Sequence, residues 1–240
     1  MRSAPFDLLL SSGFLCFSSH CGFLSALETR GLAPSAIVGT SSGSLAAAML
    51  AAGLGADEIA DVMSEQRPIS LVRPSRTPWR GPLSTRALVR RMREVLPPTF
   101  AELERPLAVG VYRPGVREPL LLTEGDLPRA VAASCAVPKM FSPISIDGNR
   151  YADGGAVDRT MHRAWREWRP GQEALVHLVS SLPAGEFGPR DGVADADEDV
   201  LGVVRTERTA ASFFSLKDFE GERARAREAA GRQLDALLLM

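Results

Sequence analysis

A serine flanked by two glycines is the residue pattern in this chain with the clearest chemical meaning. The segment Ile37–Ser44 reads Ile-Val-Gly-Thr-Ser-Ser-Gly-Ser, so Ser41 has Gly39 two positions before it and Gly43 two positions after it. This G-x-S-x-G spacing is typical of a nucleophile elbow, a tight strand-to-helix turn that presents a serine hydroxyl above a sheet. Glycines are needed because the backbones of the strand and of the helix nearly touch at this turn. We therefore expect Ser41 to be a nucleophile, although the pattern also fits an ordinary strand–turn–helix connection.

A nucleophilic serine needs a base, and Asp153 is the carboxylate best placed to supply one. It stands at the end of a predicted strand, and Gly154 and Gly155 follow it directly. With glycine at these two positions, no side chain would obstruct a second backbone segment or a substrate. A simple Asp-Gly turn is the alternative interpretation, because such turns are common.

The histidines are the other candidate bases. His20 precedes a predicted helix, His162 follows a predicted turn, and His177 lies within an apolar predicted strand. Each of these positions is typical of a polar group at a helix end or in a core. The chain order Ser…Asp…His still allows a conventional triad in which His162 or His177 is the base.

Length and composition define the general class of protein. A chain of 240 residues with 45% hydrophobic side chains and a net charge of −1 is typical of one globular α/β domain, residues 1–240. The three cysteines have no regular spacing, so we expect buried thiols and a reducing, cytoplasmic compartment. They are Cys16, Cys21 and Cys135. No run reaches transmembrane length, and the apolar run after Arg2 is expected to be a core strand rather than a signal peptide. No cluster of potential ligands has metal-site spacing, so we expect neither a metal nor another cofactor.

Charge is unevenly distributed along the chain. Every charged side chain from Arg67 to Arg93 is an arginine, and Trp79 stands in the middle of this span. We interpret residues 66–96 as a cap or flap that contacts phosphate-bearing head groups at the periphery of a membrane, with a solvated surface excursion as the alternative. No nucleic-acid recognition motif accompanies the arginines, so we expect no nucleic-acid partner. Residues 183–200 are predicted to form an acidic loop.

The hydrophobic pattern alternates between strands and helices, which predicts a largely parallel sheet with helices on both faces. Strands are expected over residues 6–11, 35–39, 107–112, 118–123, 142–146, 150–152 and 175–180. Helices are expected over residues 21–30, 42–52, 57–66, 85–95, 126–134 and 216–239, the last within a C-terminal helical segment, 213–240.

Four blocks of the chain follow one another in a recognisable order. They are Gly22–Glu28, the elbow around Ser41, residues 130–143 and the Asp-Gly-Gly at residues 153–155. Together they resemble the patatin-like phospholipase family. The resemblance implies a three-layer α/β fold and a Ser-Asp dyad in place of a triad, with Ser41 as the nucleophile and Asp153 as the base. A carboxylate that takes the hydroxyl proton itself needs a raised pKa, which burial can supply.

The loop after the first predicted strand departs from the family pattern. Family members usually carry a glycine-rich loop that ends in Arg/Lys-Gly, whereas Ser11–Phe17 contains Gly13 and no basic residue. By the resemblance, the backbone N–H groups of Gly13, Phe14 and Ser42 form an oxyanion hole. If this loop needs a positive φ, we expect strain at Phe14 or Phe17. The family's usual Asn/Pro after Asp-Gly-Gly is also absent, and its place is taken by Asp158, Arg159 and Thr160.

These expectations combine into one predicted function and two alternatives. The predicted function is a serine lipid acyl hydrolase of phospholipase A or lysophospholipase type, whose substrate is a lipid or phospholipid acyl ester. One alternative is a Ser-His-Asp triad esterase. The other is a catalytically weak or silent patatin-like protein that binds lipid or a partner through the Arg67–Arg93 span.

Overall fold

The buried apolar runs of the chain pair into one mixed sheet. In the computed structural model, which describes residues 5–180 and 197–239, the strands lie in the order β10-β9-β1-β2-β5-β8-β7, and β6 also pairs with β5. Neighbours from β10 to β5 are parallel, whereas β6, β7 and β8 pair in antiparallel fashion. The strands are β1 Asp7–Leu10, β2 Ala36–Thr40, β5 Leu107–Tyr112, β6 Pro119–Leu122, β7 Ile144–Ile146, β8 Asn149–Asp153, β9 Ala174–Val179 and β10 Val200–Thr206.

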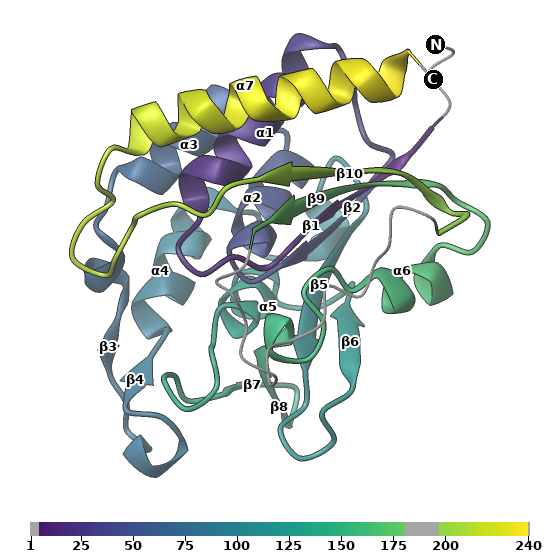
Figure 1. The fold of residues 1–240 in the computed structure, drawn as a ribbon. Coiled ribbons are helices and arrows are strands. Elements are labelled where there is room, and N and C mark those ends of the chain that lie inside the picture. Colours follow the sequence, from purple (N-terminus) through teal and green to yellow (C-terminus); the bar gives the residue numbers. More distant parts are fainter. Residues whose placement is uncertain (1–4, 181–196, 240) are drawn as a thin grey trace.

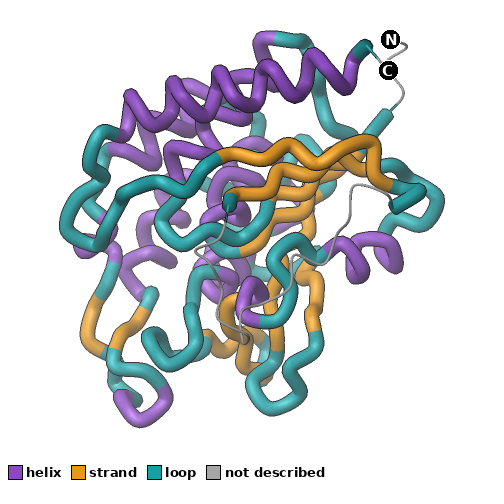
Figure 2. Tube along the Cα trace, viewed as in Figure 1, coloured by secondary structure: helices purple, strands orange, loops and turns teal. Residues whose placement is uncertain are grey.

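Helices cover both faces of this sheet unequally (Figures 1 and 2). Six helices share the larger core on one face, and α6, His162–Trp168, packs on the other face. The six are α1 Phe17–Thr29, α2 Ser42–Ala51, α3 Ala56–Ser64, α4 Arg86–Val95, α5 Leu127–Ser134 and α7 Phe219–Leu238. This helix–sheet–helix arrangement confirms the predicted three-layer α/β fold.

Both faces of the parallel strands are buried, which explains why these strands are apolar throughout. Leu8 and Leu10 of β1 belong to the larger core, whereas Leu9 between them belongs to the core beneath α6. Trp165 of α6 is fully buried in that second core. Because neighbouring side chains of a strand point to opposite faces, a strand covered on both sides shows no polar alternation. The run after Arg2 is thus a core strand, as predicted.

The arginine-rich residues 66–96 contain several short elements. After the 3₁₀ helix η1, Pro68–Leu71, strands β3 (Arg73–Pro74) and β4 (Leu83–Ser84) form a small hairpin that carries η2, Pro78–Arg80, and extends at the lower left of Figure 1. Leu83 anchors the hairpin, since its N–H donates to Met140 O at 3.1 Å and its carbonyl accepts from Ser142 N–H at 2.8 Å. The remaining 3₁₀ helices are η3 Phe100–Glu102 and η4 Gly154–Ala156.

Besides the unpredicted short strands β3 and β4, three elements differ from the sequence-based expectation. Helix α1 begins at Phe17 rather than Cys21, so His20 lies inside the helix and not before it. Tertiary contacts account for the earlier start, because the Ser18 hydroxyl donates to Glu222 and the Ser19 hydroxyl donates to a backbone carbonyl, that of Glu207. Helix α6 and strand β10 were not predicted. Of the predicted acidic loop, residues 183–196 lie outside the described residues, and β10 already begins at its last position.

Helices α1 and α7 approach each other closely at Gly22 (Figure 1). A Cβ atom at Gly22 would lie 2.8 Å from Arg227 N and 2.7 Å from Ala226 Cβ, and it would also collide with the Arg223 carbonyl. Backbone atoms of a packed helix cannot move aside cheaply. Glycine at this position therefore sets the spacing between the two helices.

Gly22→Ala is expected to lower the free energy of unfolding by about 1–3 kcal/mol, because the added methyl group overpacks the helix interface. Urea denaturation monitored by circular dichroism measures this change. Gly55→Ala is the matched control, since its Cβ would meet only the ends of two flexible side chains, Glu28 at 3.3 Å and Glu58 at 3.6 Å. Equal stability of Gly22→Ala and the wild type would contradict the packing argument.

Candidate active site

Ser41 lies in a strained turn between β2 and α2. Its φ of 55° and ψ of −123° are rare for a residue with a side chain. A Cβ atom at Gly39 would lie 2.6 Å from Ser44 Cα, and one at Gly43 would lie 2.6 Å from Ser11 O. Both flanking glycines are thus required by close backbone contacts. This turn has the geometry of a nucleophile elbow.

Side chains from distant segments hold the Ser41 backbone in this conformation. The Ser41 N–H donates to Ser134 Oγ at 2.8 Å, and the Ser134 hydroxyl donates onward to Gly110 O at 2.6 Å. The Ser41 carbonyl accepts from the Ser44 hydroxyl at 2.7 Å and from the Cys135 thiol at 3.4 Å. Sequence reasoning assigned no role to Ser134 or Cys135, and their only signal was their place in the block of residues 130–143.

Asp153 reaches Ser41 across strand β5. It ends β8, where it pairs with Val111, and a Cβ at the following Gly154 would lie 2.7 Å from the Gly110 backbone. The Ser41 side chain lies near enough to the Asp153 carboxylate to lower its pKa, and this carboxylate accepts a hydrogen bond from Gly155 N–H at 2.8 Å. The two residues that the sequence singled out, more than a hundred positions apart, therefore meet at one edge of the sheet.

Burial makes the Asp153 carboxyl an unusually strong base. Only 5% of the residue is exposed, and desolvation raises its pKa from 3.8 to about 7, against the lowering effect of the Ser41 side chain and the Gly155 N–H. Removing a carboxylate from water disfavours its charged form, which is why the first effect prevails. A carboxylate with such a pKa can accept a proton near neutral pH.

The loop of residues 11–16 lies directly beside the elbow. The Gly13 carbonyl accepts from the Ser42 hydroxyl at 2.5 Å and from Cys16 N–H at 2.9 Å. The positive φ of this loop falls on Leu15, at 59°, and not on Phe14 or Phe17 as expected. Gly13 has no positive φ, so its role here is close approach to Cys16 and Val179, each 3.2 Å from a hypothetical Cβ.

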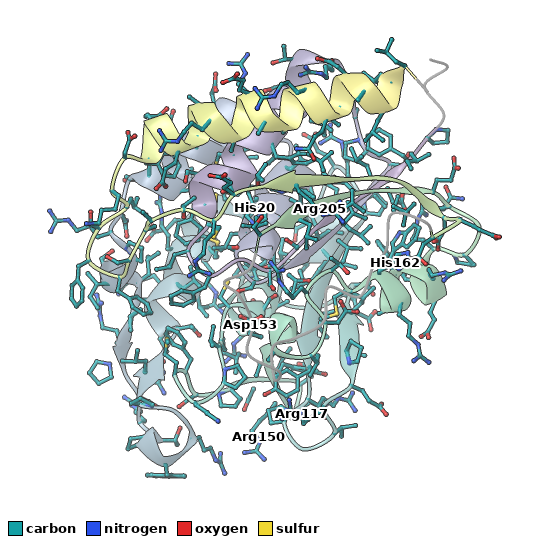
Figure 3. The ribbon with its side chains drawn as sticks, viewed as in Figure 1. His20, Arg117, Arg150, Asp153, His162 and Arg205 are labelled. Carbon is teal, nitrogen blue, oxygen red and sulfur yellow. The ribbon has the colours of Figure 1, made fainter. Side chains whose placement is uncertain are left out.

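The histidines have other partners. His162 contacts Asp199 through Nε2 at 3.1 Å and Asp197 through Nδ1 at 3.7 Å, and it is the first residue of α6, well apart from Asp153 in Figure 3. His20 and His177 face each other at 3.1 Å between their Nδ1 atoms. The second nitrogen of His20 contacts Ser42 Oγ, and that of His177 contacts Thr206 Oγ1. Both ring nitrogens of each histidine are thus used away from the Ser41 hydroxyl.

An apolar cavity of about 70 Å³, measured as the space open to the centre of a water-sized sphere, opens beside Ser41. Leu45 of α2 and Leu88 of α4 contribute to its wall, and the arginine-rich segment supplies Pro68, Leu71 and Val72. Cys135, expected to be a buried thiol, is half-buried and lines this cavity, whereas Cys16 and Cys21 are buried as expected. Its apolar lining suits a hydrocarbon group.

Neither a metal cluster nor a membrane-spanning helix is found in the part of the chain that the structure describes. Within residues 5–180 and 197–239, no group of three or more His, Cys, Asp or Glu side chains is arranged to hold an ion. No helix in these two ranges combines the length and the apolar composition needed to cross a bilayer.

The fold and site together define an α/β protein with an elbow serine next to a buried aspartate. The family model for patatin-like phospholipases matches residues 8–164, and the chain therefore belongs to the patatin-like phospholipase family. The matched range includes both Ser41 and Asp153.

Relatives and solved structures agree with this assignment. Uncharacterized NTE family proteins of Mycobacterium bovis and Mycobacterium tuberculosis are each 29% identical over 215 residues, which cover 87% of this chain and 57% of the relative. The chain thus spans little more than half the length of these curated relatives. VipD from Legionella pneumophila superimposes with a TM-score of 0.61 at 15% identity, covering 98% of this chain and 66% of VipD. ExoU of Pseudomonas aeruginosa gives a TM-score of 0.59 at 16% identity, covering 98% and 54%. At such identities the likeness shows the fold alone.

The raised pKa of Asp153 predicts a pH-dependent difference in stability between the wild type and Asp153→Asn. Between about pH 4 and pH 7 the folded protein keeps a proton on Asp153 that the unfolded chain releases, so stability from this group falls as pH rises through that window. Relative to Asp153→Asn, the wild type should lose on the order of 4 kcal/mol of unfolding free energy from pH 4 to pH 8. Urea denaturation of both proteins across this range measures the difference. A difference that stays constant with pH would contradict the burial argument.

Proposed function

We propose that this protein is a serine lipid acyl hydrolase that works through a Ser41–Asp153 dyad and cleaves carboxylic esters of phospholipid or lysophospholipid type. The observation that carries the proposal is the proximity of the elbow serine, Ser41, to the buried carboxylate of Asp153, whose pKa is raised to about 7. The apolar cavity at Ser41 supports an acyl chain as the bound group. Membership of the patatin-like phospholipase family supports the same class of reaction.

The reaction begins when Asp153 takes the hydroxyl proton of Ser41 and Ser41 Oγ bonds to the ester carbonyl carbon. The carbonyl electron pair moves onto oxygen and gives a tetrahedral oxyanion. When this intermediate collapses, the C–O bond to the alcohol breaks, and the alcohol leaves with the proton from Asp153. Asp153 then deprotonates a water molecule that attacks the acyl-enzyme. The fatty acid leaves and the proton returns to Ser41.

The oxyanion needs donors that are in place before charge develops. We assign this role to the backbone N–H groups of Gly13, Phe14 and Ser42. Ser42 is the first residue of α2, so its N–H belongs to the unsatisfied amino end of that helix. Phe14 and Ser42 both line the cavity in which the substrate carbonyl would lie.

Two alternatives have less support. A triad esterase would need His162 or His177 beside Ser41, but both have other partners at both ring nitrogens. A silent lipid-binding protein would not need the strain at Ser41 or the buried charge at Asp153. Fluorophosphonate labelling of the purified protein separates the silent protein from the hydrolase. A Ser41 adduct supports the hydrolase, and lipid binding without an adduct supports the silent protein.

Ser41→Ala and Asp153→Asn are each expected to lower hydrolysis of micellar acyl esters by about a thousandfold or more, because nucleophile and base act as a unit. In the wild type, kcat/KM should rise about tenfold per pH unit below about pH 7 and level off above it, since Asp153 must be ionised to act. A pH–rate profile and titrated active-site concentrations measure both effects. A folded His162→Gln variant serves as the control for a triad based on that histidine. Full activity in either folded dyad variant would refute the proposal.

We further propose that the Arg67–Arg93 span contacts an anionic membrane surface. Trp79 on the hairpin is 77% exposed, and Arg76 and Arg80 beside it are also exposed. Phe214 is 72% exposed, and its neighbour Phe213 lines the cavity. An indole ring flanked by arginines suits the boundary between lipid head groups and acyl chains. This surface would bring the cavity mouth to the lipid.

Trp79→Ala combined with Arg76→Gln and Arg80→Gln is expected to weaken binding to phosphatidylglycerol-containing vesicles by about tenfold or more. The triple variant lacks both the indole ring that enters the lipid boundary and the two arginines that attract anionic head groups. Co-sedimentation with these vesicles and with pure phosphatidylcholine vesicles measures the effect. Arg163→Gln is the matched control, since this arginine is also exposed and belongs to α6, which lies on the opposite side of the molecule from the hairpin in Figure 1. Unchanged binding of the triple variant would contradict the assignment.

A further inference from the structure

A buried arginine holds the first peptide of the loop after β1. Arg159 is only 5% exposed, and its Nη2 donates to Ser12 O at 2.9 Å and also to Val179 O. In return, Ser12 N–H donates to the Arg159 carbonyl at 2.8 Å. Residues 11–17 contain no basic side chain. The cation that faces this loop is therefore supplied by a segment that follows Asp153 in the chain.

The Ser42 hydroxyl holds the next peptide of the loop through the Gly13 carbonyl, at 2.5 Å. Behind Ser42 stands a buried row of polar side chains that starts at β10. Thr206 Oγ1 lies 2.8 Å from His177 Nε2, the two Nδ1 atoms of His177 and His20 lie 3.1 Å apart, and His20 Nε2 lies 3.1 Å from Ser42 Oγ. In Figure 3, His20 lies between the upper helices and the sheet.

The hydrogen bonds of this row run in one direction. Burial lowers the pKa of His20 to about 3, with a smaller effect from Arg159, and burial lowers the pKa of His177 as well, so each ring carries a single proton. Because the Ser42 proton goes to Gly13 O, Ser42 Oγ must accept from His20 Nε2–H. His20 Nδ1 then accepts from His177 Nδ1–H, and His177 Nε2 accepts from the Thr206 hydroxyl. Every donor points toward the Gly13 carbonyl.

Holding these two carbonyls fixes the direction of the N–H groups that follow them. In a trans peptide the C=O and the next N–H point in opposite directions. Ser12 C=O is held by Arg159, so Gly13 N–H points away from Arg159. Gly13 C=O is held by Ser42 and by Cys16 N–H, so Phe14 N–H points away from both. Phe14 itself lines the cavity at Ser41.

We propose that Arg159 and Ser42 are positioning residues that hold the Ser12 and Gly13 carbonyls, so that the N–H groups of Gly13 and Phe14 are aimed at the developing oxyanion. The row from Thr206 to His20 keeps the Ser42 hydroxyl turned toward Gly13. This inference rests on the acyl hydrolase function proposed above. It assigns to the side chain of Ser42 a role separate from that of its backbone N–H.

Two matched inhibitors test the proposal. An acyl trifluoromethyl ketone adds Ser41 Oγ to its carbonyl carbon and forms an oxyanion, with the proton going to Asp153, whereas the methyl ketone of the same chain binds without addition. Arg159→Met and Ser42→Ala should lower kcat by about tenfold or more with little change in KM. They should weaken trifluoromethyl ketone binding by a similar factor and leave methyl ketone binding unchanged. Arg159→Lys and Ser42→Thr, which keep a donor, should restore most of the loss.

Ser19→Ala and Arg105→Met are the matched controls, because each removes a donor to a backbone carbonyl elsewhere, that of Glu207 and Leu50 respectively. Both control variants should bind each of the two ketones as tightly as the wild type does. The inference would be overturned if Arg159→Met and Ser42→Ala bound both ketones more weakly by the same factor, or if both variants kept the wild-type kcat. The hydrolase function would stand in either case. A wild-type protein that forms no trifluoromethyl ketone adduct overturns both proposals.

Discussion

The rest of the structure depends on one contact, that between the Ser41 side chain and a carboxylate withdrawn from water. Desolvation raises the pKa of Asp153 to about 7. Such a contact needs three backbone segments to lie closer together than side chains would allow. Glycines at 39, 43, 110 and 154 make this possible, because a Cβ atom at any of them would come within 2.7 Å of a neighbouring atom. The sheet, in this account, serves to bring β2, β5 and β8 together at that point.

This arrangement costs stability, and the surrounding residues explain how it persists. A left-handed φ at Ser41 and a buried carboxylate are each unfavourable, by about 1–3 kcal/mol for the backbone conformation alone. A hydrogen bond from the Ser41 N–H to Ser134, and bonds from Ser44 and Cys135 to the Ser41 carbonyl, hold the elbow on both sides of Ser41. The larger core beneath the elbow, which α1, α2 and α7 share, supplies the packing that keeps these segments in place. Strain of this kind is typical of sites that are organised before the substrate arrives.

Much of the fold and the key contact could be predicted because the relevant signals are local. The apolar runs marked the strands, and the glycines around Ser41 and after Asp153 marked the two close approaches. Ser134 and Arg159 could not be assigned roles, because their partners Gly110 and Ser12 are distant in the sequence and carry no pattern of their own. Helix α6 was missed because it is short, and the early start of α1 because serines favour helix ends over helix interiors.

The pKa of Asp153 is the quantity that tests this account most directly. A ¹³C NMR titration of carboxyl-labelled protein, with Asp153→Asn used to assign the signal, measures it without reference to any substrate. We expect a midpoint near pH 7, because burial raises the pKa by more than the Ser41 side chain and the Gly155 N–H lower it. A midpoint near pH 4 would show that the carboxyl is hydrated like an ordinary aspartate. That result would contradict the assignment of Asp153 as the general base.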